Sequence, residues 1–421
     1  MNVYFYAGRF SHPFFREQFR HPPEGVTYIP STADLRGDGF KSDLRHASSF
    51  GYRLTRRISR ELVRAFGLAG IPRIACARAA AADLIHSSRH LLLNRRPWVV
   101  EVEVASAFAW YSRRNIRRQR MRRMIERRFA SPWCRRILPW TEAAKKSLLN
   151  AFDCRAFAHK MEVVYPCIAA KPVDLAARRQ KRHLTLLFVG PGFYGAGFYT
   201  KGGVETLLAF DRLARRHVRL RLEMVCLPPA EILQRWGGRP DITFRSRIPN
   251  EELEALYRQA DIFVLPTHID TLGFVYLEAF SYGVPCVGAR QFAVPEIITD
   301  GVTGFTVGPA SSNLGPDGLP RHEPALYEGH PLVEEWKRPS EAYVANLAEA
   351  LARLVENPEL RWRMSAAAYE EVLCGKLSVT RRRQALRRIY EESLALAHLG
   401  GAERNLADEV AGENEATMFP E

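Results

Sequence analysis

The chain has 421 residues, 47% hydrophobic and 25% charged, which is typical of a soluble globular protein long enough for two domains. Its formal net charge of +15 indicates an anionic partner: a nucleotide, a membrane surface or a nucleic acid. No apolar run reaches the roughly 18 residues of a membrane span, and the first residues show no signal-peptide pattern. The seven cysteines are scattered and lack metal-ligand spacing, which argues against disulfides and zinc and favours free thiols in a reducing cytoplasm.

Short apolar runs predict the strands of the first half of the chain. We expect Thr141 to be the N-cap of a helix that extends through Asn150, because its hydroxyl can accept a backbone N–H. A turn at Gly8, a loop at 35–48 and a basic helix at 54–66 are also expected. The predicted strands cover 2–7, 26–30, 82–87, 97–104, a run that ends at 137–142, and 161–165.

The strand at 97–104 carries two acids, Glu101 and Glu103, on one face by its two-residue period. One interpretation is an edge strand with one wet face. The other is that these carboxylates serve a site at the end of the strand. The sequence leaves both open.

An arginine-rich segment follows at 112–136, with aromatic and aliphatic residues between its basic ones. A helix of this composition can lie on an anionic membrane surface, and it can bind nucleic-acid phosphates, which we expect less. It can also be a solvated helix whose apolar positions face the core. The membrane interpretation involves the arginines from Arg113 to Arg136.

The second half reads as alternating strands and helices after a linker at 166–182 that is rich in proline, alanine and basic residues. The glycine-rich loop after the first of these strands contains a G-x-G-x-x-G pattern, but the helix does not open at its third glycine, so a dinucleotide site is not predicted. Asn250 is expected to cap the helix that follows it. The acidic end, 400–421, has the composition of a disordered segment. Strands are expected at 184–190, 219–226, 242–245, 260–266 and 284–288, and helices at 204–216, 251–259, 274–281, 340–355, 358–373 and 379–399, with a loop insertion at 309–332.

The stretch from Thr267 to Gly308 organises the second half. A buried strand ends before it, a loop carries Asp270, a helix carries Glu278, and another strand follows, which is one βαβ unit. Ligands bind at the carboxyl ends of such strands. Fixed-offset residues make the pattern specific: Asp270, Gly273, Glu278, Ala279, Gly283, Pro285, Val287, Pro295, Glu296, Asp300, Gly301 and Gly304.

This pattern resembles the signature of retaining, nucleotide-sugar-dependent glycosyltransferases of family 4 (group 1). Two departures are that Asp270 stands where the family has glutamate, and that Leu272 replaces the usual aromatic. The resemblance implies the α/β GT-B fold, with two Rossmann-like domains facing each other across a cleft. It implies an acceptor-side domain at 1–175, joined by a last helix that crosses back at about 378–398, and a donor-side domain at 183–375.

The resemblance assigns the loop after the strand at 184–190 to the donor diphosphate. Gly190 ends this strand, and Lys201 and Gly202 open the following helix, where a lysine and free backbone N–H groups can face phosphate. Pro191 stands where the family has an arginine, so one basic contact is missing or comes from elsewhere.

The resemblance also implies donor-binding roles for the motif. Glu278 would accept the ribose hydroxyls and Asp270 would face the transferred sugar, because a carboxylate can accept from two neighbouring hydroxyls. The alternatives are a helix cap for Asp270 and a surface helix acid for Glu278. Leu272, Gly273 and Phe274 line the same loop. On the acceptor side, Gly8 and Glu103 occupy the places of a family glycine and histidine.

We expect no metal and no cofactor besides the nucleotide sugar, since no D-x-D pair occurs where a metal-dependent transferase needs one. Catalysis would involve Lys201, Asp270 and Glu278, with a glycan or lipid-linked acceptor. The alternatives are a nucleotide-sugar epimerase, a sugar phosphorylase, or a non-catalytic anion-binding protein of the same fold. The location expected is cytoplasmic, with possible attachment to the inner face of a membrane.

Overall fold

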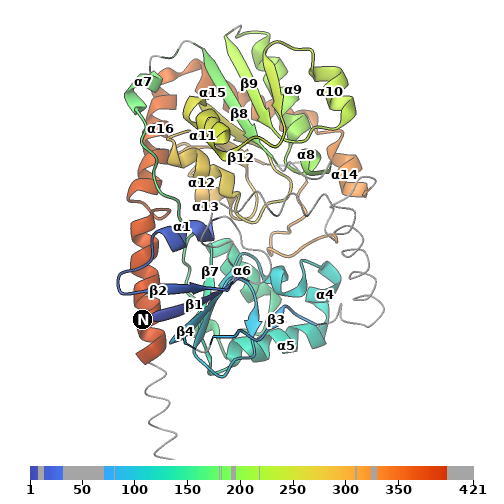
Figure 1. Cartoon of the computed structure of the whole chain (residues 1–421). Helices are drawn as coiled ribbons and strands as arrows, with labels where there is room; N and C mark the ends of the chain where they lie inside the picture. The colour runs from blue at the N-terminus through green and yellow to red at the C-terminus, as the bar shows by residue number, and fades with distance from the viewer. Residues whose placement is uncertain are drawn as a thin grey trace, which may run out of the picture.

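The computed structural model describes residues 1–7, 14–31, 71–79, 81–179, 181, 183–190, 196–217, 219–308, 311–323 and 330–395. The expected turn at Gly8, the loop at 35–48, the basic helix at 54–66 and the acidic end at 400–421 lie outside these residues. Within them, no helix is both long and apolar enough to span a bilayer. Figure 1 shows two α/β halves stacked on each other, with the last helices (red) running along one side of both.

The sheet of the first half is parallel and runs in the order β2-β1-β4-β6-β7. Helices and short 3-10 turns connect its strands and cover them. The strands are β1 (Asn2–Tyr6), β2 (Thr27–Pro30), β4 (Leu84–Ser87), β6 (Trp98–Val102) and β7 (Cys134–Pro139), with a separate pair, β3 (Ile74–Ala75) and β5 (Leu91–Leu92); the helical elements are α1 (Phe15–Arg20), η3 (Ala105–Ala109), α4 (Arg113–Arg117), α5 (Gln119–Ala130), α6 (Glu142–Ala151) and η4 (Ala158–Lys160).

The sheet of the second half is also parallel, in the order β10-β9-β8-β11-β12-β13. Its central strands are continuous buried apolar runs, as expected for a sheet covered on both faces. The strands are β8 (Leu184–Val189), β9 (Leu220–Val225), β10 (Ile242–Arg245), β11 (Ile262–Leu265), β12 (Cys286–Ala289) and β13 (Gly304–Val307); the helices are α7 (Leu175–Arg179), α8 (Ala196–Thr200), α9 (Gly203–Ala214), α10 (Ala230–Trp236), α11 (Asn250–Gln259), α12 (Phe274–Ser281), α13 (Val294–Ile297), α14 (Pro331–Trp336), α15 (Glu341–Glu356) and α16 (Pro358–Leu373).

Most predicted elements are confirmed, and four expectations are wrong. Residues 161–165 form no strand, because only Met161 bridges β7, at Ile137. Helix α11 begins at Asn250 itself, with Pro249 as its N-cap. The third concerns 309–332, where α14 already begins at Pro331. Finally, β6 is not an edge strand, since it lies between β4 and β7.

The arginine-rich segment is not one helix. Arg118 has an extended backbone that ends α4 and begins α5, and the last two arginines of the segment lie in β7. In α5 the apolar side chains Met121, Ile125 and Phe129 are buried in the core of the first half. Of the three interpretations, the one in which the apolar positions face the core is therefore correct for this face of the helix.

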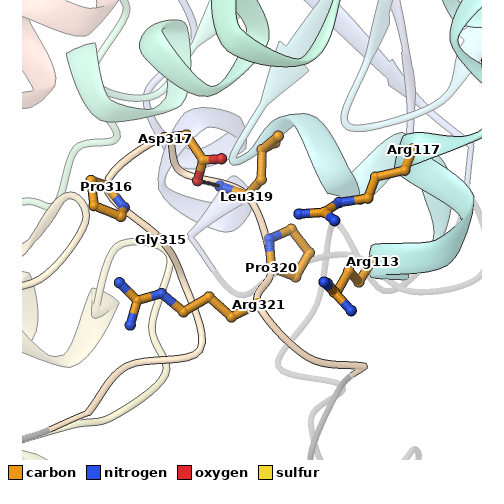
Figure 2. Close-up of a pocket in the computed structure, with 8 residues that line it drawn as sticks. All are labelled: Arg113, Arg117, Gly315, Pro316, Asp317, Leu319, Pro320 and Arg321. Carbon is orange, nitrogen blue, oxygen red and sulfur yellow. Dashed lines mark hydrogen bonds between the residues drawn. The ribbon is translucent and has the colours of Figure 1, made fainter.

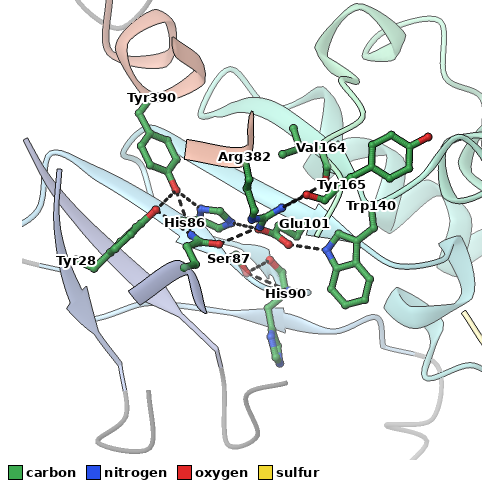
Figure 3. Close-up of polar contacts among 11 residues, drawn as sticks. Tyr28, His86, Ser87, His90, Glu101, Trp140, Val164, Tyr165, Arg382 and Tyr390 are labelled. Atoms are coloured by element: carbon green, nitrogen blue, oxygen red, sulfur yellow. Dashed lines mark hydrogen bonds and ion pairs between the residues drawn. The ribbon is translucent and has the colours of Figure 1, made fainter. Parts of the chain in front are cut away.

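A helix over 379–395 returns the chain to the first half and is anchored there by a buried polar network (Figure 3). Tyr390 Oη lies 2.5 Å from Nδ1 of His86 in β4, and Nε2 of His86 lies 2.9 Å from Oε1 of Glu101. The guanidinium of Arg382 donates to the same carboxylate and to Gln18. Trp140 Nε1 also donates to Glu101, at 2.5 Å. We name these residues the buried network.

Burial would raise the pKa of Glu101, but the charge of Arg382 and the hydrogen bonds from His86 and Trp140 outweigh it and hold the pKa below its usual value. The burial of the His86 ring lowers the pKa of this histidine. Glu101 is thus a structural carboxylate that joins the last helix to the sheet.

Candidate active site

The candidate site lies at the carboxyl ends of β8 and β11, where open α/β sheets bind ligands. The loop after β11 turns into α12 at Gly273, whose φ of 76° is left-handed and whose added Cβ would stand 2.4 Å from the Tyr276 ring. Only glycine fits there without strain. This turn fixes the direction of the loop that carries Asp270.

Lys201 and Asp270 are brought into direct contact. Lys201 Nζ lies 2.6 Å from Asp270 Oδ2 and 3.1 Å from the carbonyl oxygen of Ile269. The other carboxylate oxygen accepts the backbone N–H groups of Gly273 at 2.8 Å and Leu272 at 3.3 Å. The side chains of Lys201 and Asp270 keep 20% and 13% of their surface exposed. Both charged groups are therefore held in place while remaining reachable by a ligand.

Gly190 and Gly202, the two glycines expected near the donor phosphates, lie at the end of β8 and at the start of α9. Gly202 is the left-handed N-cap of α9, and a Cβ there would come within 2.2 Å of the Pro266 carbonyl oxygen at the end of β11. This close approach places Lys201 beside the loop of Asp270. Gly190 follows β8 and donates its N–H to Val225 at 2.8 Å. Pro191 lies outside the described residues.

The residues on either side of Gly273 have packing contacts. Leu272 is buried, at 3% exposure, in the core of the second half. The Phe274 ring lies 5.7 Å from the ring of Phe14, which precedes α1 in the first half. The Asp270 carboxylate accepts N–H groups of the turn before α12, although the N-cap position itself belongs to Gly273.

Glu278 lies one turn into α12 and is half-buried. Its Oε2 accepts the hydroxyl of Tyr257 from α11 at 2.8 Å. Burial raises the pKa of Glu278 to about 7, since the hydrogen bond and the charge of Lys171 only partly compensate. Glu278 is therefore not a freely solvated acid, because its side chain is half-buried and hydrogen-bonded to Tyr257, and its role toward the ribose stays a prediction.

Glu103 comes from the first half and interacts with residues of the second half. It follows β6, is 9% exposed, accepts a hydrogen bond from Tyr111 and interacts with the hydroxyl of Thr271 in the other half. Burial raises the pKa of Glu103, and the Asp270 carboxylate adds to the rise, whereas Arg89 and Arg73 oppose it. The two halves thus meet with Glu103 and Asp270 near each other.

Glu296 of the motif also joins the halves. Its carboxylate accepts the first backbone N–H groups of α6, from Glu142 at 2.8 Å and Ala143 at 2.7 Å, and the Tyr165 hydroxyl at 2.7 Å. A carboxylate is favourable at a helix N-terminus because the helix dipole is positive there. This contact holds the second half against the first.

Sequence reasoning missed the partners of the expected acids. Tyr257, Thr271 and Tyr111 were not singled out, and Gly8 lies outside the described residues. Tyr111 and its neighbour Trp110 have positive φ values of 59° and 62°, which are uncommon for non-glycine residues. No sequence signal for that turn exists, because such conformations are imposed by the surrounding structure.

Within the described residues, no group of three His, Cys, Asp or Glu side chains is placed to hold a metal ion.

Comparison with solved structures shows the fold. The whole architecture is similar to HepE of Anabaena, solved in complex with UDP and glucose, with a TM-score of 0.54, 14% identity, and coverage of 93% of this chain and 99% of that one. It is also similar to sucrose-phosphate synthase from Thermosynechococcus elongatus, with a TM-score of 0.52, 14% identity, and coverage of 80% and 78%. The chain has the GT-B fold, as predicted.

The family evidence concerns the second half. Residues 177–314 match the family model described as "Glycosyl transferases group 1". The chain is 28% identical over 241 residues to D-inositol 3-phosphate glycosyltransferase of Corynebacterium jeikeium, covering 54% of this chain and 49% of that protein. It is 37% identical over 119 residues to a GDP-mannose-dependent alpha-(1-6)-phosphatidylinositol monomannoside mannosyltransferase of Mycolicibacterium smegmatis, covering 25% and 31%. The chain spans about half or less of the length of these relatives. The resemblance to group 1 glycosyltransferases is confirmed.

Proposed function

We propose that this protein is a retaining glycosyltransferase that moves a sugar from a nucleotide-diphosphate sugar to a glycan or lipid-linked acceptor. The observation that carries the proposal is the contact of Lys201 with Asp270 at the carboxyl ends of β8 and β11, inside the segment that matches the family model. Glu278 lies on the helix that follows the same loop.

The proposed donor contacts follow from the charge of each group. The Glu278 carboxylate accepts the two ribose hydroxyls, which neutral side chains bind less strongly. Lys201 and the N-terminus of α9 face the diphosphate, and Asp270 faces the hydroxyls of the transferred sugar. Gly190 and Gly202 let the backbone approach the phosphates, and Leu272, Gly273 and Phe274 shape the loop.

The proposed reaction breaks the bond between sugar C1 and the phosphate oxygen and forms a bond from C1 to an acceptor oxygen on the same face. The acceptor proton passes to the leaving phosphate oxygen. Negative charge on the diphosphate grows as the bond breaks, and Lys201 stabilises it in the transition state. Glu103, which lies across the cleft from Asp270, is placed on the acceptor side. No metal is required in this scheme, so EDTA should leave the rate unchanged.

We also propose that 1–175 together with about 378–398 form the acceptor-side domain, and that 183–375 form the donor-side domain. Support comes from the two separate sheets and from the contacts of Arg382 and Tyr390 with the first half.

A membrane role is proposed for the arginine-rich segment at 113–136. On α5 the exposed side chains Arg120, Arg123 and Arg127 lie three and four residues apart, so they share one face. The apolar side of the helix is buried, so attachment to an anionic surface would be electrostatic and would not involve insertion. The cytoplasmic location stays a prediction.

The test is incubation with a panel of nucleotide sugars, without and with acceptors. Slow hydrolysis of one donor, accelerated by a glycan or lipid-linked acceptor, is expected. A donor whose sugar is epimerised would indicate an epimerase, and release of a sugar phosphate with added phosphate would indicate a phosphorylase. Binding with no turnover of any donor would indicate a non-catalytic protein. A Glu278→Ala variant should lose donor use, which separates the proposed site from a contaminating activity.

A further inference from the structure

A groove separates α4 of the first half from residues 311–323 of the second half. One cavity of about 380 Å³ is lined by Arg113 and Arg117 of α4 and by Asp317 and Arg321 of the other wall (Figure 2). An adjoining cavity of about 710 Å³ is also lined by Arg113 and Arg117. We call the space around Arg113, Arg117 and Arg321 the arginine groove.

The guanidinium groups that line the arginine groove form no pair with the described acids that share its lining. Within the described residues, none of the guanidinium groups of Arg113, Arg117 and Arg321 forms a hydrogen bond or an ion pair. Two nearby acids are occupied by backbone. Asp317 Oδ1 accepts the Leu319 N–H at 3.0 Å, and Glu323 accepts the Arg114 N–H at 2.8 Å. Glu335 lines the adjoining cavity and does not pair with them either. Within the described residues, the three guanidinium groups therefore have N–H donors available to an anionic ligand.

Both walls of the groove lead back to the candidate site. On the first wall, Tyr111, two residues before Arg113, donates to Glu103. On the second wall, the Asn313 N–H lies 3.4 Å from the carbonyl oxygen of His268, two residues before Asp270. Asn313 also accepts the Arg321 N–H at 2.7 Å. Both walls of the groove are thus joined to the segments that carry Glu103 and Asp270.

We propose that the arginine groove binds an anionic group of the acceptor substrate, a phosphate or a carboxylate; this rests on the proposed glycosyl transfer. Guanidinium groups suit such oxyanions because their N–H donors form a planar fork that matches two oxygens. The cavity volumes exceed the size of a single oxyanion, so the groove has room for the sugar that carries it. The groove thereby selects acidic acceptors over neutral ones of the same shape.

The test compares charged and neutral ligands of matched size at low ionic strength. Binding of tetragalacturonate is compared with maltotetraose, and binding of glucose 6-phosphate with glucose. The wild type should bind at least one charged ligand more tightly than its neutral match, and the arm that responds identifies carboxylate or phosphate. In the double variant Arg113→Gln/Arg117→Gln the preference should fall about tenfold or more.

The matched control is Arg120→Gln/Arg123→Gln, which removes the same charge from the neighbouring helix and should keep the preference. Equal losses in both double variants would show that net charge alone attracts the anions, and would overturn the proposal. Failure of the wild type to prefer either charged ligand would also overturn it. Thermal midpoints like that of the wild type show that the variants fold. Donor hydrolysis by the wild type reports separately on the proposed glycosyltransferase activity.

Discussion

The buried network and the cleft contain carboxylates from the same stretch of chain, but these carboxylates differ in how their charge is compensated. Glu101 has its own buried cation, Arg382, and its pKa is lowered. Glu103 lies two residues later, and its Oε1 is 3.8 Å from the guanidinium of Arg89. Burial nevertheless raises the pKa of Glu103, and the charge of Asp270 adds to the rise. The first carboxylate is held by a buried cation, whereas burial dominates the pKa of the second.

The difference teaches how to separate structural from functional acids in this protein. A buried acid with a dedicated cation contributes to folding, and its removal leaves an unpaired charge. A buried acid whose desolvation is not compensated is a candidate for ligand binding. Glu278, with a pKa raised to about 7, belongs to the second group.

The largest effect is expected in the buried network. Arg382→Met leaves Glu101 buried without its cation and with hydrogen bonds only from His86 and Trp140, which should lower the free energy of unfolding by about 3–5 kcal/mol. Chemical denaturation measures this loss. Arg387→Met is the control, because Arg387 lies on the same helix and its partners Glu24 and Glu391 are exposed. Similar losses in the two variants would remove the distinction between the network and the surface.

The next effect is expected at the cleft. Lys201→Ala should lower kcat by about 10²–10³-fold, or about 2.7–4 kcal/mol, since charge on the diphosphate grows in the transition state. Lys337→Ala, whose side chain lies 5.5 Å from the Tyr199 ring on α8, should change the rate little. If Asp270→Asn lost as much as Lys201→Ala and the double variant lost no more, Lys201 would act only by positioning Asp270.

The sequence was a good guide to the second half and a weaker one to the first. Periodicity and the motif predicted β11, α12 and β12, because buried parallel strands and capped helices have local signals. Contacts between the halves have no local signal. The pairing of Glu101 with Arg382 joins residues 281 positions apart, and the bond from Glu296 to α6 joins residues more than 150 apart. The expected role of Lys201 rests on the family resemblance, and its pairing with Asp270 could be seen only in the fold.

The break at Arg118 shows a further limit. Composition predicted one basic helix, and arginine is a good helix former. The chain nevertheless turns there, because Ile116 and the apolar side of α5 are both buried in the first half's core. Tertiary packing thus separates the segment into two helices. Helix α4 lines the arginine groove, and α5 carries the exposed arginines.

A third prediction tests that division. Replacing Arg120, Arg123 and Arg127 with glutamine should weaken binding to anionic vesicles by about 3 kcal/mol, since each basic residue near such a surface contributes about 1 kcal/mol. Vesicle co-sedimentation measures the loss, which should shrink at high salt. The double variant Arg113→Gln/Arg117→Gln should lose less. A wild type that does not bind anionic vesicles at low salt would disprove the membrane role.

A further effect expected is a pH dependence at Glu278. The folded pKa of about 7 exceeds the ordinary glutamate value of 4.5, so the native state binds the proton more tightly. Glu278 therefore destabilises the fold progressively as the pH rises from 4.5 to about 7. The isosteric variant Glu278→Gln lacks this slope, and the difference between the two denaturation profiles isolates it from other titrating groups.

The same titration should control donor binding, because ribose hydroxyls donate best to the ionised carboxylate. With a pKa of about 7, the ionised fraction of Glu278 rises about tenfold from about pH 6 to about pH 8. The Kd of the nucleotide sugar that the donor panel identifies, whose diphosphate does not titrate in this range, should fall by up to the same factor. In Glu278→Gln the Kd should stay near the acidic wild-type value at every pH. An equal slope in both proteins would assign the titration to another group, and a flat wild-type profile would remove Glu278 from the ribose site.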